Sequence, residues 1–140
     1  MLHDGSFGAM GGLITSIEDF SKYVSFHLSA WPPRSEPDNR PAKRSTLREM
    51  HTPQYTGLYT DATDINGDPC AVVSGYGYGL VITKDCHEIK WISHGGALPG
   101  FGSNYIFFPD YGIGLMAFCN LTYTQALIWY FEKHVVLLGP

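Results

Sequence analysis

Residues 94–103 read His-Gly-Gly-Ala-Leu-Pro-Gly-Phe-Gly-Ser, and a largely apolar segment follows them as far as Asn120. The stretch begins with a basic side chain, and two glycines and a small residue come directly after it. Glycine has no Cβ, so a ligand or a reacting carbonyl can approach the main chain closely at such positions. We therefore expect a strand here that combines a titratable side chain with an accessible backbone.

The composition is that of a folded domain. The chain has 140 residues, of which 44% are hydrophobic and 16% are charged, and this length suffices for one domain, residues 1–140, with its own core. A net charge of −4, without a basic stripe or a base-stacking motif, argues against nucleic acid as a partner. No segment approaches the roughly 20 apolar residues of a membrane span, so we expect no membrane-spanning segment.

Two helices are predicted in the first part of the chain. Four apolar residues share one face over residues 16–29, which is the pattern of an amphipathic helix. Thr15 is its expected cap, with Glu18 completing a capping box. Ser45 is expected to cap a short second helix that ends near residue 51, because the proline at position 53 disfavours helical geometry before it.

Strands and a closing helix are predicted for the second part. The expected strands form two hairpins and cover residues 75–83, 88–93, 103–108 and 112–119. The final helix is marked by an apolar stripe over residues 127–138, with Gly139 in the place of a C-terminal cap. Surface loops are expected at residues 5–12, 31–44 and 54–73. The sequence therefore predicts an α+β fold, with an antiparallel sheet of about four strands packed with N- and C-terminal helices.

The cysteines and carboxylates form no recognisable ligand pattern. Cys70, Cys86 and Cys119 are three in number and irregularly spaced, which argues against a disulfide scaffold and leaves open a single bridge. No pair of cysteines or histidines has the spacing of a zinc motif, and the carboxylates at 61–68 do not follow that of a calcium loop. We therefore expect no metal site and no cofactor.

Five segments resemble, in the right order, motifs of the class C branch of the serine β-lactamase and penicillin-binding-protein superfamily. They are residues 11–20 (the Gly-Gly-Leu helix start), 47–54 (Leu-x-x-Met-x-x-Pro-Gln), 76–80 (Tyr-Gly-x-Gly), 94–103 (the Lys/His-Thr/Ser/Gly-Gly motif) and 108–120 (the last hairpin with its asparagine). The resemblance implies a partial β-lactamase/transpeptidase-like fold. It also implies that the chain is the C-terminal part of a β-lactamase-related hydrolase, which in its complete form cleaves an ester, peptide or lactam.

The resemblance assigns roles to four residues of the motif at residues 94–103. His94 stands where the family has lysine or histidine, beside the nucleophile and facing the carboxylate of the substrate. Because lysine stays charged at neutral pH whereas histidine can lose its charge there, His94 favours the esterase or peptidase side of the family. Gly95 and Gly96 are implied to border the substrate, Gly95 without the usual hydroxyl contact. Ala97 is implied to give its backbone N–H to the oxyanion hole.

The superfamily's other two motifs are missing. The sequence contains neither Ser-x-x-Lys nor Tyr-x-Asn, which hold the nucleophilic serine and the groups that move its proton. Without a serine activated by a neighbouring base, acyl transfer has no nucleophile. We therefore expect this chain alone to be inactive. The resemblance implies that it is a truncated portion of a bacterial serine hydrolase. In its complete form, that hydrolase is implied to act on a small-molecule or peptide-like acyl substrate in the periplasm or outside the cell.

Two alternatives remain open from the residues. The chain is either a non-catalytic ligand-binding module that keeps the cleft, or a structural module that associates with other chains. Exposed sheet edges favour pairing with another copy, so we expect a homo-oligomer through such an edge. The alternative interpretation of His94, which the motif match disfavours, is an ordinary histidine at a strand end, with the glycines serving only a kinked strand.

Overall fold

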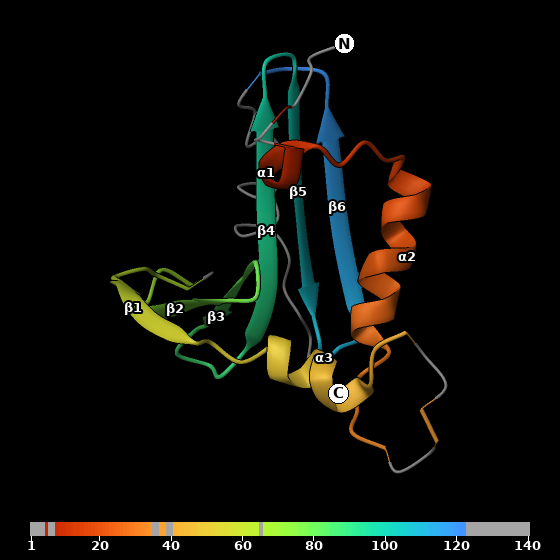
Figure 1. Cartoon of the computed structure of the whole chain (residues 1–140). Coiled ribbons are helices and arrows are strands. Elements are labelled where there is room, and N and C mark those ends of the chain that lie inside the picture. Colours follow the sequence, from red (N-terminus) through yellow and green to blue (C-terminus); the bar gives the residue numbers. More distant parts are fainter. Residues whose placement is uncertain (1–4, 6–7, 35–36, 39–40, 65, 123–140) are drawn as a thin grey trace.

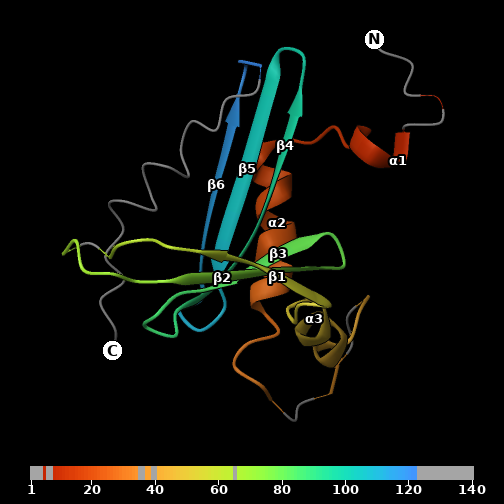
Figure 2. The same ribbon diagram turned by 90° about the vertical axis from the view of Figure 1, so that its left-hand side faces the viewer.

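A six-stranded antiparallel sheet forms the centre of the molecule. The computed structural model describes residues 5, 8–34, 37–38, 41–64 and 66–122. The strands follow one another in space as in sequence, and they are β1 (Tyr55–Thr60), β2 (Val72–Gly77), β3 (Leu80–Lys84), β4 (Lys90–Leu98), β5 (Phe101–Phe108) and β6 (Ile113–Cys119). β4, β5 and β6 run along the length of the molecule, and β1, β2 and β3 are turned across them (Figures 1 and 2). The predicted α+β class is confirmed, with six strands in place of about four.

The two additional strands come from segments that the sequence predicts differently. Residues 75–83 are predicted as one strand, but the chain reverses inside them at Tyr78 and Gly79, whose φ angles are +54° and +76°. Two consecutive residues with positive φ are the mark of a type I′ hairpin turn, and they separate β2 from β3. Residues 54–73 are predicted as a loop but contain β1 and the start of β2. All six residues of β1 are exposed, so it lacks the alternation of buried side chains that marks a strand in a sequence.

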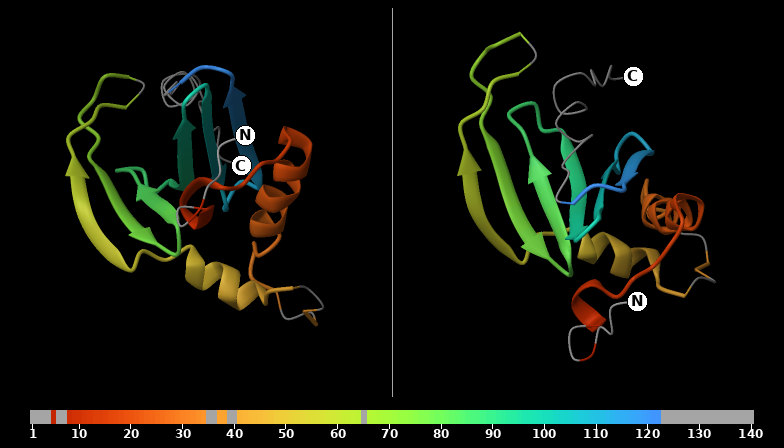
Figure 3. Two further views of the ribbon diagram at one scale, coloured as in Figure 1. Left: turned by 45° about the horizontal axis from the view of Figure 1, so that its top comes forward. Right: turned by 90° about the horizontal axis from the view of Figure 1, so that it is seen from above.

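Helix α2 (Ile17–Leu28) confirms the predicted first helix and corrects its cap. The backbone N–H of Asp19 donates to Ser16 Oγ over 3.0 Å, so Ser16 caps the helix and Thr15 does not. The cap lies one residue later than predicted. Ser16 has the extended backbone of a cap residue, with φ −89° and ψ 161°, and the helix begins after it. Figure 3 shows α2 packed along the sheet beside β6.

Helix α3 (Arg44–Met50) lies close to its predicted position but has a different cap. The backbone N–H of Arg44 donates to the carboxylate of Asp38, six residues earlier, whereas Ser45 lies inside the helix. A cap supplied by a loop residue has no fixed sequence spacing, which explains why the local pattern pointed to Ser45.

The remaining helical predictions concern the two ends of the chain. α1 (Gly8–Gly11) is a single turn inside residues 5–12, which are predicted as a loop. The predicted helix over residues 127–138 lies outside the described residues. Of the helices in the described ranges, none has the length and apolar character needed to cross a membrane.

The hydrophobic core lies between α2 and one face of the sheet. Val24 of α2 packs with Ile92 of β4 and Phe107 of β5, and the last two are direct partners across the strands. Partly buried side chains that extend this cluster are Phe20, Leu28, Met50, Tyr105 and Met116. Gly114 of β6 lets the helix approach, because a Cβ there would lie 2.5 Å from Val24 Cγ1.

Candidate functional site

The motif at residues 94–103 forms the end of the β4–β5 hairpin, and we call these residues the hairpin tip. Pro99 and Gly100 make the turn between the paired residues Leu98 and Phe101. Proline fixes its own φ near −65° and Gly100 has φ +83°, which together fit a type II turn. Residues 95–101 are all exposed. The predicted strand therefore continues through the motif and returns, which makes the tip an exposed two-stranded ribbon.

One edge of β4 is open along the tip. β3 pairs with β4 only between Lys90 and Ser93, whereas β5 pairs with it as far as Leu98. Within the described ranges, no strand pairs with the other edge of residues 94–98. Alternate residues of an antiparallel strand direct their N–H and C=O groups to each edge. The open edge thus presents backbone donors and acceptors that a ligand can bind.

His94 stands at the start of this open edge, with both ring nitrogens engaged. Its Nδ1 lies 2.7 Å from the carbonyl oxygen of Gly95, and its Nε2 lies 3.2 Å from the hydroxyl of Tyr76. A carbonyl only accepts, so Nδ1 carries the proton of the neutral ring and Nε2 accepts from the phenol. The two contacts fix the ring so that Nε2 and the Tyr76 hydroxyl form a pair able to move a proton.

The glycines of the tip have different surroundings. A Cβ on Gly96 would lie 2.8 Å from the Ser103 hydroxyl oxygen, and that hydroxyl donates to the carbonyl of Gly96 over 3.3 Å. A Cβ on Gly95 would lie 3.4 Å from the backbone oxygen of Ser103. Ala97 is exposed opposite Gly102. The three residues implied to border or bind a substrate are therefore contiguous with His94 on the open edge.

Tyr105 faces His94 across the hairpin and anchors this part of the sheet to α2. Its ring lies 5.0 Å from that of Phe20 and 6.0 Å from that of Tyr23, between ring centroids. Burial, with a smaller contribution from Tyr23, raises the pKa of Tyr105 well above its ordinary value. The phenol therefore stays protonated, which makes Tyr105 a packing residue and not a base.

A second titratable cluster lies in the core, away from the tip. His27 Nδ1 lies 2.8 Å from His51 Nε2, and the Trp31 indole N–H donates to His51 Nδ1 over 2.9 Å. Because the indole can only donate, His51 carries its proton on Nε2 and donates it to His27. Burial lowers the pKa of His27 to about 4, and burial together with the charges of His27 and Lys90 lowers that of His51 to about 3. Both rings are neutral at pH 7 and join α2 to the end of α3.

Tyr76 is the residue of the site that sequence reasoning missed. The tyrosines of the Tyr-Gly-x-Gly motif are not in a Tyr-x-Asn context, so no role follows for them from the sequence. The structure brings Tyr76 to His94 although 18 positions separate them. The same side chain lines a groove over β1 and β2, together with Tyr55, Leu58 and Val81. The available signal is the Tyr-Gly-x-Gly motif itself, at residues 76–79.

The α+β fold agrees with what the sequence comparisons find. A comparison with models of protein families matches residues 1–132 to the Beta-lactamase family. The chain belongs to this family and so to the β-lactamase-like serine hydrolase superfamily. No curated protein and no solved structure was found to match it.

Proposed function

We propose that this chain supplies one wall of the acyl-transfer site of a β-lactamase-related serine hydrolase. The observation that carries the proposal is the open edge of residues 94–98 beside the Tyr76–His94 pair. This edge places backbone donors, a titratable ring and residues without bulky side chains in one exposed row. An ester, peptide or lactam that lies along the row would pair with the strand as a further β-strand does.

Each residue of the row has a proposed role. His94, in its protonated form, attracts the carboxylate of the substrate, and together with the Tyr76 hydroxyl it supports proton transfer at the reacting group. Gly95 and Gly96 give the substrate room to approach the main chain. Ala97 donates its backbone N–H to the oxyanion, where loss of one donor typically lowers a rate by about 10²–10³-fold.

The nucleophile is proposed to come from sequence outside these 140 residues. The chain has no Ser-x-x-Lys, and the partly buried Tyr105 opposite His94 stays protonated. The substrate of the complete enzyme and the groups that activate its serine therefore depend on residues that this chain does not contain. We expect no acyl-enzyme from this chain alone.

Covalent labelling tests the proposed lack of a nucleophile. The purified chain is incubated with a fluorescent penicillin and with a fluorophosphonate, and its intact mass is measured. No adduct is the expected result. A stoichiometric adduct on a single serine would show a rebuilt catalytic site in this chain and would contradict the proposal.

The exposed edge strand β1 favours a second proposal, in which the chain is a non-catalytic module that associates with another copy. Tyr55, Leu58 and Tyr59 are 80%, 70% and 67% exposed, and β1 is an outer strand of the sheet. An apolar, unpaired edge favours strand-to-strand pairing. Sedimentation distinguishes the cases: a dimer that Leu58→Lys converts to monomer supports this proposal, and a monomer at all concentrations contradicts it.

A further inference from the structure

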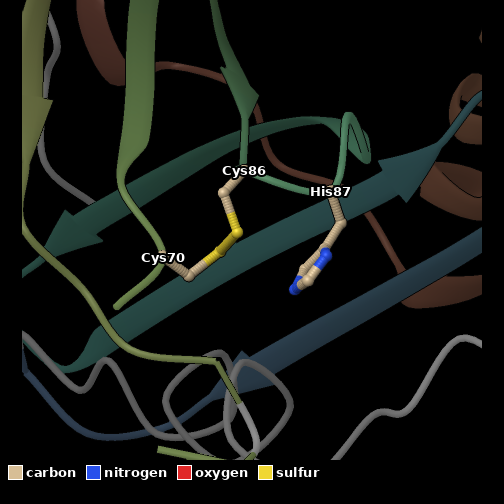
Figure 4. A group of neighbouring side chains, drawn as sticks. All are labelled: Cys70, Cys86 and His87. Carbon is tan, nitrogen blue, oxygen red and sulfur yellow. A yellow bond between two sulfur atoms is a disulfide. The ribbon is translucent and has the colours of Figure 1, made fainter. Parts of the chain in front are cut away.

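Three side chains capable of binding a metal gather where two turns of the sheet meet. Cys70 precedes β2, and Cys86 and His87 lie in the turn between β3 and β4. The two sulfurs and a ring nitrogen of His87 all lie within 4.8 Å of one another. Figure 4 shows the imidazole beside the two sulfurs, which are joined in a disulfide. This cluster lies outside the proposed hydrolase site and has no role in it.

The His87 ring lies beside a carboxylate, as the rings of metal-binding histidines commonly do. Its Nε2 lies 3.4 Å from Asp64 Oδ2. The other carboxylate oxygen, Asp64 Oδ1, accepts the backbone N–H groups of Asn66 and Asp68 over 2.8 and 3.0 Å. Histidine ligands commonly donate their second N–H to a carboxylate that is itself held by hydrogen bonds. The Asp64 carboxylate is therefore held beside the His87 ring, where a carboxylate–histidine–metal arrangement would use it.

We propose that reduction of the Cys70–Cys86 disulfide converts this cluster into a Zn²⁺ site with Cys70, Cys86 and His87 as ligands and Asp64 as the orienting carboxylate. Two thiolates and one imidazole are a donor set that zinc prefers. Three protein ligands leave one position of the tetrahedral ion for water. Oxidation closes the site, because a sulfur in a disulfide no longer carries the thiolate charge that binds the ion.

The chemistry of the switch balances with a dithiol as the reductant. One thiolate of the dithiol attacks the exposed Cys86 sulfur, and the S–S bond breaks with its electron pair passing to Cys70. The second thiolate of the dithiol then displaces Cys86, so that the reductant leaves as a disulfide and two cysteine thiols remain. Their two protons are released when the ion binds. Cys70 is only 5% exposed, so a metal ion also neutralises a thiolate that would otherwise lie buried without a counter-charge.

No sequence motif marks this site, because its ligands come from separate loops. Cys70 and Cys86 are separated by 16 positions, and Asp64 lies in the turn-rich segment before β2. None of these intervals matches the short cysteine or histidine spacings that mark zinc sites in a sequence. The antiparallel pairing of β2 with β3 brings them together.

Metal titration of the whole chain tests the proposal. The free cysteine is first removed by Cys119→Ser, so that only the paired cysteines can contribute thiolates. The reduced and the oxidised protein are then each titrated with Co²⁺ and with Zn²⁺. We expect the reduced protein to bind one equivalent, with a thiolate-to-cobalt charge-transfer band and the visible bands of a tetrahedral ion that excess Zn²⁺ removes. We expect the oxidised protein to show neither band.

Matched variants separate the ligands from general surface binding. His87→Ala is expected to weaken Zn²⁺ binding by at least about 100-fold, and Asp64→Asn by about 10-fold, as for an outer carboxylate. Asp61→Asn, in the same loop, and His94→Ala, at the hairpin tip, are expected to leave the affinity unchanged. Equal losses for Asp64→Asn and Asp61→Asn would contradict the assigned arrangement.

Two outcomes would overturn the proposal. One is Zn²⁺ binding by the oxidised protein that equals binding by the reduced protein. The other is binding by the reduced protein no tighter than that of Cys70→Ser/Cys86→Ser. Circular dichroism covers the case in which reduction unfolds the chain. Recovery of the native spectrum with Zn²⁺ then supports the site, because ion binding adds to folding energy, and no recovery contradicts it.

Discussion

The two ends of the β4–β5 hairpin have the same backbone pairing and opposite surroundings. At the hairpin base, which we define as residues 90–93 and 106–108, Ile92 and Phe107 are direct partners and are both 0% exposed. At the hairpin tip, Leu98 and Phe101 are also direct partners, yet they are 42% and 63% exposed. Helix α2 covers the base. The tip extends beyond β3, which is the strand that pairs with the other edge of β4.

This difference separates the residues that hold the fold from those that we propose to face a ligand. Large apolar side chains at the base contribute burial energy, which for one buried residue is about 1.5–3 kcal/mol. At the tip, the corresponding residues are His94, two glycines and Ala97. These residues contribute little burial energy to the folded state and leave the main chain accessible. A continuous hairpin therefore anchors the exposed, proposed site to a packed core, and binding groups are held in position most precisely on such elements.

The largest expected effect is the loss of a phenylalanine from the base. Phe107→Ala is expected to lower the free energy of unfolding by about 4 kcal/mol, because it leaves a cavity against α2 and the two buried histidines. Phe101→Ala, the matched change at the tip, is expected to cost less than about 1 kcal/mol. Chemical denaturation measures both, and equal losses would show that the tip is as much a part of the core as the base.

Acid is expected to act through the two buried histidines that pack against Phe107 of the hairpin base. Burial lowers the pKa of His27 to about 4 and that of His51 to about 3, so below their ordinary value of 6.5 the unfolded chain binds more protons than the folded chain. The contribution of these two rings to the free energy of unfolding is therefore fully present above pH 6.5. It falls as the pH drops toward 4, by up to about 1.4 kcal/mol per pH unit for each ring. Urea unfolding at several pH values measures the slope. A double variant, His27→Gln/His51→Gln, is expected to flatten it, and an unchanged slope would exclude these rings as its cause.

Gly114 of β6, beside the core, and Gly96 of the hairpin tip are expected to tolerate an added methyl group differently. Gly114→Ala places a Cβ 2.5 Å from Val24 in the packed core, and about 2 kcal/mol of destabilisation is expected from the forced shift. Gly96→Ala meets only the Ser103 hydroxyl, which can rotate away, so less than about 1 kcal/mol is expected. Thermal melts with denaturant titrations test the order, and the reverse order would place close packing at the tip.

The smallest effect on stability is expected at the Tyr76–His94 pair. Tyr76→Phe removes an exposed hydrogen bond, which contributes about 1 kcal/mol or less. It also removes the donor to His94 Nε2, so the ring ¹⁵N signals of His94 are expected to change. Tyr78→Phe, two residues away, serves as the control. Identical spectra for both variants would mean that Tyr76 does not contact His94 in solution.

Much of the fold could be predicted from local patterns. The periodic apolar residues of α2 and the strands around Pro109 are features of single segments, and they were found close to their observed bounds. The strand β1 could not be predicted because all its side chains are exposed, and the reversal at Tyr78 requires a positive φ that tyrosine rarely adopts. Asp38 could not be identified as the cap of α3, because loop folding alone brings it to the helix.

The candidate site was predictable only as a row along one strand. The His-Gly-Gly sequence pointed to an accessible backbone at residues 94–97, which agrees with their position on an open edge. The partners that come from other strands were not predictable. Tyr76 reaches His94 only because β2 and β3 turn across β4, and His51 meets His27 only through the packing of α3 under α2.

Amide NMR of the isotopically labelled chain with added benzylpenicillin tests whether the open edge of β4 faces the substrate. Shifts are expected at the amides of Gly95, Gly96 and Ala97 and in the ring of His94, while the amides of Ile92 and Phe107 stay in place. A ligand that moves the base as much as the tip, or moves neither, would contradict the assignment of the open edge of β4 as the substrate-facing wall.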